Sequence, residues 1–286
     1  MVHKRGAIIV IPKSGLSNRL RVIATCVKLA RETNKDLYIY WESNQYLNAS
    51  YKDLFKMLPG IVIKEPPLKY KLWLLFNSSS PKLNFIGKLY LKLFDFDFVF
   101  FDNMAKLIWH NKMDLKKEVS QSKNVLLATC QELNYYDLED YKLFLPTSEL
   151  QNEIDSITKS FSKNTIGIHI RSTDNEDSKN KSPFRIFCNR IEEEIKLNGE
   201  VSFFLSTDNE EYQKVLLEKF GHARILFHEK EFRRDITKGI KDAVIDIFCL
   251  SITSKIYGSY FSSFSYVAGR IGNTPVEVLM QDENLT

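Results

Sequence analysis

Two stretches of the chain alternate short apolar runs with segments of helical periodicity. In the first, the run Ala7–Ile11 predicts a strand, and Leu20, Ile23, Ala24, Val27 and Ala30 follow at helical spacing. The run 36–41 (DLYIYW) predicts a second strand. A strand, a loop, a helix and another strand in this order are the building block of a parallel sheet.

The second stretch begins near Thr165 and is more regular. Its predicted strands are 165–170, 201–207, 223–228, 255–259 and 275–280. The predicted helices between them open at Ser182-Pro183 and end at Asn198-Gly199, run over 209–220 and 236–251, and run from the Ser-rich segment 261–265 to Gly272. This alternation predicts a doubly wound α/β domain.

The segment Glu65–Tyr141 lacks this order and is rich in Leu, Phe, Tyr, Trp and Lys. Sparse periodicity predicts helices and loops packed onto the first domain. Polar Leu150–Lys163 is the candidate linker, so we expect an N-terminal domain over 1–150 and a C-terminal domain over 151–286. The aromatic and basic residues of the middle segment fit stacking on sugars or contact with an anionic membrane. The alternative is an ordinary apolar core from which the lysine side chains extend to the solvent. The residues concerned are Trp73, Phe76, Phe85, Tyr90 and Phe94, with Lys69, Lys71, Lys82, Lys88 and Lys92.

Composition excludes several classes of protein. The 286 residues carry 40 Lys plus Arg against 36 Asp plus Glu, a formal charge of +4 without basic blocks, which argues against nucleic acid as a partner. Cys26, Cys130, Cys188 and Cys249 are far apart in the sequence, and no His spacing fits a metal site. No signal peptide or membrane span is predicted, so we expect a cytoplasmic protein.

Candidate chemistry gathers where the predicted strands end. His169, Arg171 and Asp174 follow the strand 165–170, and ligands bind at this edge of open parallel sheets. The guanidinium of Arg171 suits phosphate oxygens, although a surface pair between Arg171 and Asp174 explains the pattern equally well. The segment Ser262-Ser263-Phe264 opens the last helix, where free amides either bind an anion or are simply capped.

Two carboxylates and one loop complete the candidate residues. Asp208 follows the strand 201–207 and fits a ligand contact or a helix N-cap. Asp246 fits a solvated helix face, but its apolar neighbours also give weight to a buried carboxylate paired with a ligand. Gly15, Asn18 and Arg19 lie in the loop after the first strand and are expected to face any cleft between the domains. The D-x-D pattern Asp95-Phe96-Asp97 is interpreted as chance, and Glu192-Glu193-Glu194 as a solvated helix face.

These sites together resemble the fucosyltransferase superfamily, most closely the α1,6-fucosyltransferases and their nodulation-factor relatives. The segment 15–41 (GLSNRLRVIATCVKLARETNKDLYIYW) is similar to that family's first β-loop-α-β unit. HIRSTD is similar to its H-x-R-R-T-D segment, FFLSTD to its L-A-T-D-D strand end, and DIFCLS with GSYFSSFS to its last conserved stretch. The middle segment shows no match.

The resemblance implies a GT-B-like α/β fold, with two Rossmann-like domains whose parallel sheets face a cleft. It also implies inverting, metal-independent transfer of fucose from GDP-fucose to a glycan acceptor, in surface polysaccharide biosynthesis. Arg171, Ser262, Ser263 and Phe264 would bind the diphosphate. Asp208 and Asp246 would recognise guanosine, His169 would line the donor site, and Asp174 would order the donor loop.

The sequence departs from the family at two positions. The second arginine is Ser172, and the position of the base glutamate is Lys179, so Glu176 and Asp177 are the candidate bases. Two alternatives remain at this stage. One is a glycosyltransferase that uses another nucleotide sugar, and the other is a non-catalytic nucleotide- or glycan-binding module.

Overall fold

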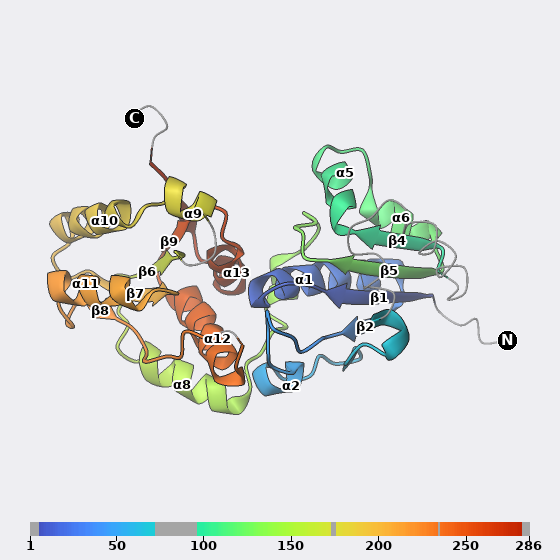
Figure 1. Cartoon of the computed structure of the whole chain (residues 1–286), viewed down its shortest axis with the longest axis horizontal. Helices are drawn as coiled ribbons and strands as arrows, with labels where there is room; N and C mark the ends of the chain where they lie inside the picture. Colours follow the sequence, from blue (N-terminus) through green and yellow to red (C-terminus); the bar gives the residue numbers. More distant parts are fainter. Residues whose placement is uncertain (1–5, 72–95, 173–175, 234, 282–286) are drawn as a thin grey trace. The chain divides into compact units, whose positions relative to one another are not determined.

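The computed structural model divides into two compact units, Met1–Leu143 and Phe144–Thr286. It describes residues 6–71, 96–172, 176–233 and 235–281. Each unit contains its own five-stranded sheet (Figure 1). The chain therefore has the α/β architecture of two Rossmann-like sheets that the sequence predicts.

The sheet of the first unit has the strand order β3-β2-β1-β5-β4, and every neighbouring pair is parallel. Its strands are β1 (Ala7–Pro12), β2 (Asp36–Tyr40), β3 (Val62–Lys64), β4 (Phe98–Phe101) and β5 (Asn124–Thr129). The helical elements described with it are α1 (Leu16–Thr33), α2 (Tyr51–Leu54), η1 (Asp102–Met104), α5 (Ala105–Trp109), α6 (Leu115–Gln121) and α7 (Leu138–Tyr141).

The predicted β1-α1-β2 unit is confirmed, but the prediction for the middle segment is wrong in part. Two strands of the sheet come from that segment, and one of them, β5, pairs directly with β1. Val125, Leu126, Leu127 and Ala128 of β5 are almost fully buried, because this strand has neighbours on both sides and lies inside the unit.

The sheet of the second unit has the order β10-β9-β6-β7-β8 and is likewise parallel. Its strands are β6 (Thr165–Ile170), β7 (Ser202–Thr207), β8 (Ile225–Leu226), β9 (Ile256–Ser259) and β10 (Val276–Leu279). The helices are α8 (Ser148–Thr158), α9 (Glu176–Lys181), α10 (Phe184–Leu197), α11 (Glu210–Phe220), α12 (Thr237–Ile252) and α13 (Ser263–Gly272).

The alternation predicted for this unit is confirmed, with β8 shorter than expected. The predicted linker Leu150–Lys163 is wrong, because most of it belongs to α8. Leu150 and Ile154 on one side of α8 are buried, and the helix packs against α12. Two apolar side chains four positions apart are enough to dock a mostly polar helix.

The central strand β6 directs alternate side chains to opposite faces of the sheet. Ile166, Ile168 and Ile170 pack with apolar side chains of α10 and α11. The other face meets α12 so closely that a Cβ on Gly167 would lie 2.8 Å from the Cδ2 of Leu250. Figure 1 shows α10 and α12 on opposite sides of the strands. His169, two residues after Gly167, therefore lies on the face that α12 and α13 cover.

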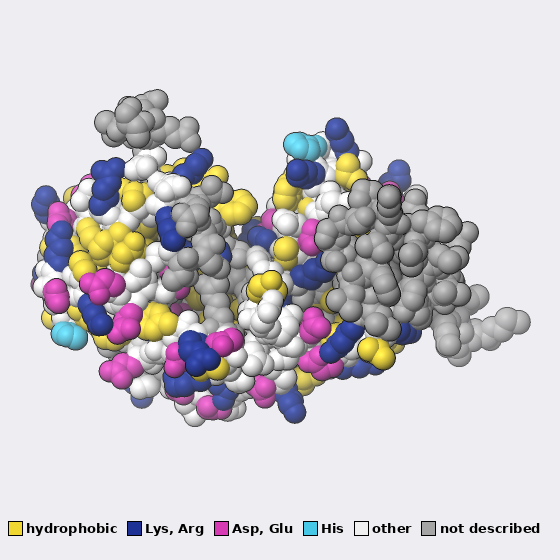
Figure 2. Space-filling model, in the orientation of Figure 1, with side chains coloured by type: hydrophobic (Ala, Val, Ile, Leu, Met, Phe, Trp, Pro, Cys, Tyr) yellow, Lys and Arg dark blue, Asp and Glu magenta, His cyan; other side chains and the backbone are white. Residues whose placement is uncertain are grey.

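The described surface mixes both signs of charge, and Figure 2 shows Lys and Arg interspersed with Asp and Glu on it. Not all of the acidic string 192–194 is solvated as expected. Glu194 is buried, and its carboxylate accepts hydrogen bonds from Lys255 and Tyr257. Within the described ranges, no helix combines the length and the hydropathy that a membrane crossing needs.

Candidate nucleotide-binding site in the second unit

The carboxyl ends of β6, β7 and β9 are joined by hydrogen bonds just beyond the strands. The backbone amide of Arg171, after β6, donates to the Oγ of Ser259 at the end of β9 over 2.9 Å. The next amide, that of Ser172, donates to Oδ1 of Asp208 after β7 over 2.8 Å. Predicted residues from two separate strands, Arg171 and Asp208, thus meet at one edge of the sheet. Asp208 does not cap α11, because that role belongs to Asn209.

His169 is buried at the end of β6, in register with Ser206 of β7 and Gly258 of β9. Its ring stacks on Phe264 in the first turn of α13, with the ring centroids 4.7 Å apart and the planes inclined by 16°. Burial lowers the pKa of His169 to about 4, so the imidazole is neutral at neutral pH. Its Nδ1 has no hydrogen-bond partner in the described part of the chain, which is unusual for a buried polar atom.

Helix α13 begins directly beside His169. Ser262 is its N-cap, and the Oγ of Ser262 accepts from the amide of Phe264 over 3.4 Å, as the capping hypothesis predicts. The first turn carries no acidic residue, so its amides and the helix dipole favour an anion. A Cβ at Gly258 would come within 2.5 Å of the Oγ of Ser265, so glycine lets the helix approach β9 this closely.

Asp246 of α12 is a buried, paired carboxylate, and the alternative of a solvated helix face is wrong. Its Oδ2 accepts from the Oγ of Ser206 over 2.7 Å and from the Nζ of Lys230 over 2.5 Å. The Nδ1 of His228 lies 3.0 Å from Oδ1 but without the alignment of a hydrogen bond. Burial alone would raise the pKa of Asp246, but the charges of Lys230 and His228 outweigh it and hold the pKa at about 2.

His228 and Lys230 are site residues that sequence reasoning missed. Both lie between β8 and α12, and their side chains are 8% and 6% exposed. Burial alone would lower the pKa of His228, but interactions with Asp242 and Asp246 raise it to about 9. The signal available in the sequence was a basic pair, HEK, at the end of a predicted strand.

The side chains of three predicted site residues are outside the described part of the structure. Asp174 lies outside the described residues. Glu176 and Asp177 begin α9, and their side chains are not among those described. The start of this helix follows the Arg171 end of β6, so the candidate bases remain close in sequence to the site.

The loop predicted after the first strand is shorter than expected, because α1 begins at Leu16, so Asn18 and Arg19 lie in its first turn. Gly15 is the N-cap of α1, and the Nδ2 of Asn18 donates to the Oγ of Ser14 over 3.1 Å. The side chain of Arg19 is fully buried. Its guanidinium donates to the backbone oxygens of Ser14 and Glu42 and to the side chain of Asn44, and it lies 4.9 Å from the ring of Trp41. Burial lowers the pKa of Arg19 to about 10. Arg19 therefore shapes this loop from the inside.

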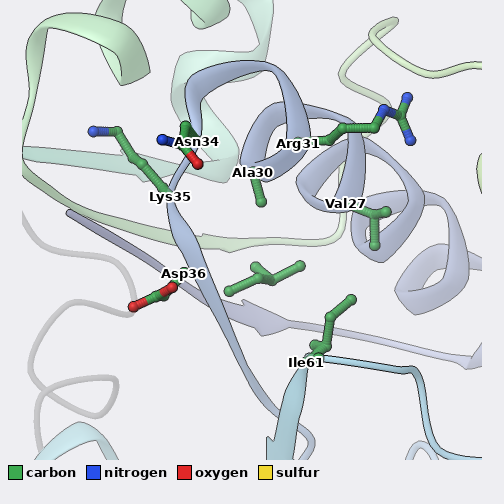
Figure 3. A pocket seen from close by; sticks show the side chains of 9 residues that line it. Val27, Ala30, Arg31, Asn34, Lys35, Asp36 and Ile61 are labelled. Atoms are coloured by element: carbon green, nitrogen blue, oxygen red, sulfur yellow. The ribbon is translucent and has the colours of Figure 1, made fainter. Parts of the chain in front are cut away.

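A cavity of about 310 Å³ opens at the other edge of the first sheet, where α1 ends and β2 begins (Figure 3). Val27, Ala30 and Leu37 contribute apolar lining, and the polar and charged lining residues are Arg31, Asn34, Lys35 and Asp36. Because the cavity lies at the amino end of β2, none of the candidate catalytic or ligand-binding residues lines it.

In the part of the chain that the structure describes, no three His, Cys, Asp or Glu side chains are placed to hold a metal ion together. Of the D-x-D pattern, Asp95 lies outside the described residues. The Oδ2 of Asp97 accepts from the amides of Lys123 and Asn124, each over 2.8 Å, so it caps the start of β5.

Comparison with solved structures identifies the fold. A NodZ α-1,6-fucosyltransferase soaked with GDP-fucose matches with a TM-score of 0.64 and 17% identity, over 94% of this chain and 93% of the other. A variant of Arabidopsis thaliana FUT1 in complex with GDP matches with a TM-score of 0.58 and 16% identity, over 98% and 71%. POFUT1 in complex with GDP-fucose matches with a TM-score of 0.56 and 12% identity, over 96% and 98%.

This chain has a fucosyltransferase-like GT-B fold. No protein-family model matches its sequence, and no curated protein matches it significantly. The predicted fold class is confirmed by the paired parallel sheets and by these neighbours.

Proposed function

We propose that the protein is a fucosyltransferase that moves fucose from GDP-fucose to a hydroxyl of a glycan. One observation carries this proposal: a buried unpartnered imidazole nitrogen, a half-buried arginine and a helix N-terminus meet at one sheet edge. The fold around them is shared with proteins whose structures hold GDP or GDP-fucose. Such an edge is where nucleotides bind in open α/β sheets.

The groups at this edge of the sheet complement the two parts of the nucleotide: donors face the negatively charged diphosphate, and carboxylates face the N–H and O–H groups of the nucleoside. The guanidinium of Arg171 offers a fork to the diphosphate, and the amides at Ser262, Ser263 and Phe264 offer a second set of donors. Asp208 and Asp246 accept from the nucleoside. The Nδ1 of His169 supplies one more contact, and Asp174 orders the loop that follows.

The chemical step is a single displacement at the anomeric carbon. Negative charge grows on the leaving diphosphate, and fixed donors that already point at it stabilise the transition state. We assign this task to Arg171 and the start of α13, and we propose that no metal ion is needed. The acceptor oxygen attacks from the opposite face of the sugar while a carboxylate removes its proton, so the configuration inverts.

The base is assigned to Glu176 or Asp177 at the start of α9. Replacing the correct one, in Glu176→Gln or Asp177→Asn, is expected to slow transfer by about 10²–10⁴-fold while GDP binding is retained. Single-turnover transfer rates for the two variants, with GDP affinity measured alongside, identify which carboxylate acts. Normal transfer rates in both variants would show that neither Glu176 nor Asp177 is the base.

A donor screen tests the function itself. Calorimetry with GDP, UDP, ADP and CMP should show binding of GDP above the others, and GDP-fucose should be hydrolysed slowly or transferred to a mixed glycan pool. Preference for another nucleotide would support a transferase with a different donor. Tight GDP binding with neither hydrolysis nor transfer would support a non-catalytic nucleotide-binding module. Indifference to all four nucleotides at millimolar concentration would contradict the proposal.

We further propose a role in surface polysaccharide synthesis by a cytoplasmic enzyme, with peripheral membrane contact through the middle segment. Most of the aromatic and basic residues predicted for that contact fall in 72–95, outside the described residues. Lys69 and Lys71 are described, and the Nζ of Lys71 pairs with Glu65 over 3.6 Å. Flotation with anionic liposomes at low salt tests the contact, and failure to float would remove it.

A further inference from the structure

Phe261 is a large aromatic residue in a backbone conformation that such residues rarely adopt. It lies in the turn between β9 and α13 with φ at 54°, in the left-handed region, and its side chain is 72% exposed. A bulky residue in this region carries strain, and an exposed phenyl ring gains little from burial. The ring lies near Tyr260, with the centroids 6.0 Å apart, but most of its surface remains exposed, so local conformation and this contact do not explain a phenylalanine here.

The surrounding contacts hold the turn in place. The amide of Tyr260 donates to the Oγ of Ser182 over 2.8 Å, and the Nζ of Lys181 lies 4.9 Å from the ring of Tyr260. On the other side, Ser262 is fixed as the N-cap of α13. Strained residues persist where their neighbours determine the backbone in this way, and they cluster at ligand sites.

The order of the strands places Phe261 at one end of the candidate site. β6 lies between β7 and β9. Asp208 follows β7 and Asp246 bonds to Ser206 of β7, whereas Phe261 follows β9. If the nucleoside lies over β7 and the diphosphate lies at Arg171 and the start of α13, the next part of the donor extends toward Phe261.

We propose that Phe261 is a stacking surface for a pyranose ring in the active site. A six-membered sugar has an apolar face of C–H groups, which pairs with an aromatic ring and needs no hydrogen-bond partner there. This inference rests on the proposed function, since it takes the orientation of the nucleotide from it. Two sugars share this chemistry, the fucose of the donor and the sugar of the acceptor that receives it.

The test removes the ring and the strain together. Phe261→Gly takes away the phenyl group, and glycine adopts a φ of 54° without penalty, so the melting temperature should not fall. If the ring holds the donor sugar, GDP binds as before while the affinity for GDP-fucose falls by about three- to tenfold. If the ring holds the acceptor sugar, both nucleotides bind and GDP-fucose is hydrolysed as in the unmodified protein, but transfer to the glycan pool is lost.

Two variants serve as controls. Phe261→Tyr keeps an aromatic face and should keep both properties. Leu197→Ala removes a side chain that is 82% exposed at the end of α10, at the opposite edge of the sheet, and should change neither. Unaltered GDP-fucose affinity and unaltered transfer in Phe261→Gly would overturn the inference. Failure of the unmodified protein to bind GDP would instead count against the proposed function.

Discussion

Each unit has an arginine between the first strand and the end of the first helical turn of its first β-loop-α segment, and the two arginines have different surroundings: Arg19 lies in the first turn of α1 and Arg171 directly follows β6. Arg19 in the first unit is fully buried, and it donates to the backbone oxygen of Ser14 and to oxygens of Glu42 and Asn44, which follow β2. Arg171 in the second unit is partly exposed at the sheet edge, and its backbone amide is held by Ser259. The guanidinium of Arg19 is part of the packed interior, whereas we propose that Arg171, at a partly exposed position, contacts the donor.

The difference follows from what surrounds each side chain. In the first unit, oxygens of Ser14, Glu42 and Asn44 converge on the guanidinium, which compensates the cost of burying its charge. In the second unit, the neighbours of Arg171 include the neutral His169 with an unpartnered nitrogen and a helix N-terminus. We expect this set of groups to favour an anionic ligand.

The largest expected effect is on catalysis by Arg171→Ala. Loss of a fixed donor to the leaving diphosphate should slow transfer by about 10²–10³-fold, with stability changed by less than about 1 kcal/mol. Initial rates of GDP release and a urea unfolding curve measure both quantities. Arg171→Lys, which keeps the charge without the fork, should recover only part of the rate. Near-normal turnover in a folded Arg171→Ala protein would contradict the assignment of Arg171 to the diphosphate.

A smaller effect, and one on stability, is expected from Arg19→Ala. Three oxygens would lose their donor inside the protein and a cavity would form, so the free energy of unfolding should fall by about 2–4 kcal/mol. Urea unfolding beside Arg171→Ala gives the comparison directly. Equal stability of the two variants would show that burial of Arg19 contributes little.

The third effect depends on pH and belongs to the second unit. The pKa of His228 is raised to about 9, so its charged form stabilises the fold fully below the ordinary value near 6.5, and this contribution is lost as the pH rises through 9. The loss amounts to about 3 kcal/mol at most. Unfolding free energies at pH 6.5 and 9.5 should differ by less in His228→Gln than in the unmodified protein. A stability profile that the substitution leaves unchanged would contradict the assigned charge.

Most of the second unit could be predicted because its strands and helices are short and regular, and because Gly, Asn or Pro residues mark where many of them begin or end. Helix α11 ends at Phe220 as predicted and is followed by Gly221, although Asn209 and not Asp208 is its N-cap. The candidate residues at the strand ends also followed, since parallel strands end at one edge. The partners of Asp246 could not be predicted. Lys230 and His228 lie in a loop between β8 and α12, and the path of an irregular loop leaves no periodic pattern in the sequence.

The first unit was harder because its sheet is assembled from distant parts of the chain. β1 pairs with β5, whose first residue, Asn124, is more than a hundred positions away from Ala7. A short apolar run such as NVLLAT is compatible with a buried strand or a buried helix segment. The aromatic and apolar stretches before it in the sequence gave no clear boundary from which to identify it as a strand. The burial of Arg19 likewise depends on oxygens from Glu42 and Asn44, which come near only once the fold has formed.

The hydroxyl of Ser182 ties the end of the chain to the proposed active site. It donates to the backbone oxygen of Leu279 in β10 over 2.5 Å while it accepts from the amide of Tyr260. A protein shortened from Leu279 onward would lose that acceptor, and the serine could rotate away from the turn that carries Phe261. Strand β10 thus helps to position the turn between β9 and α13.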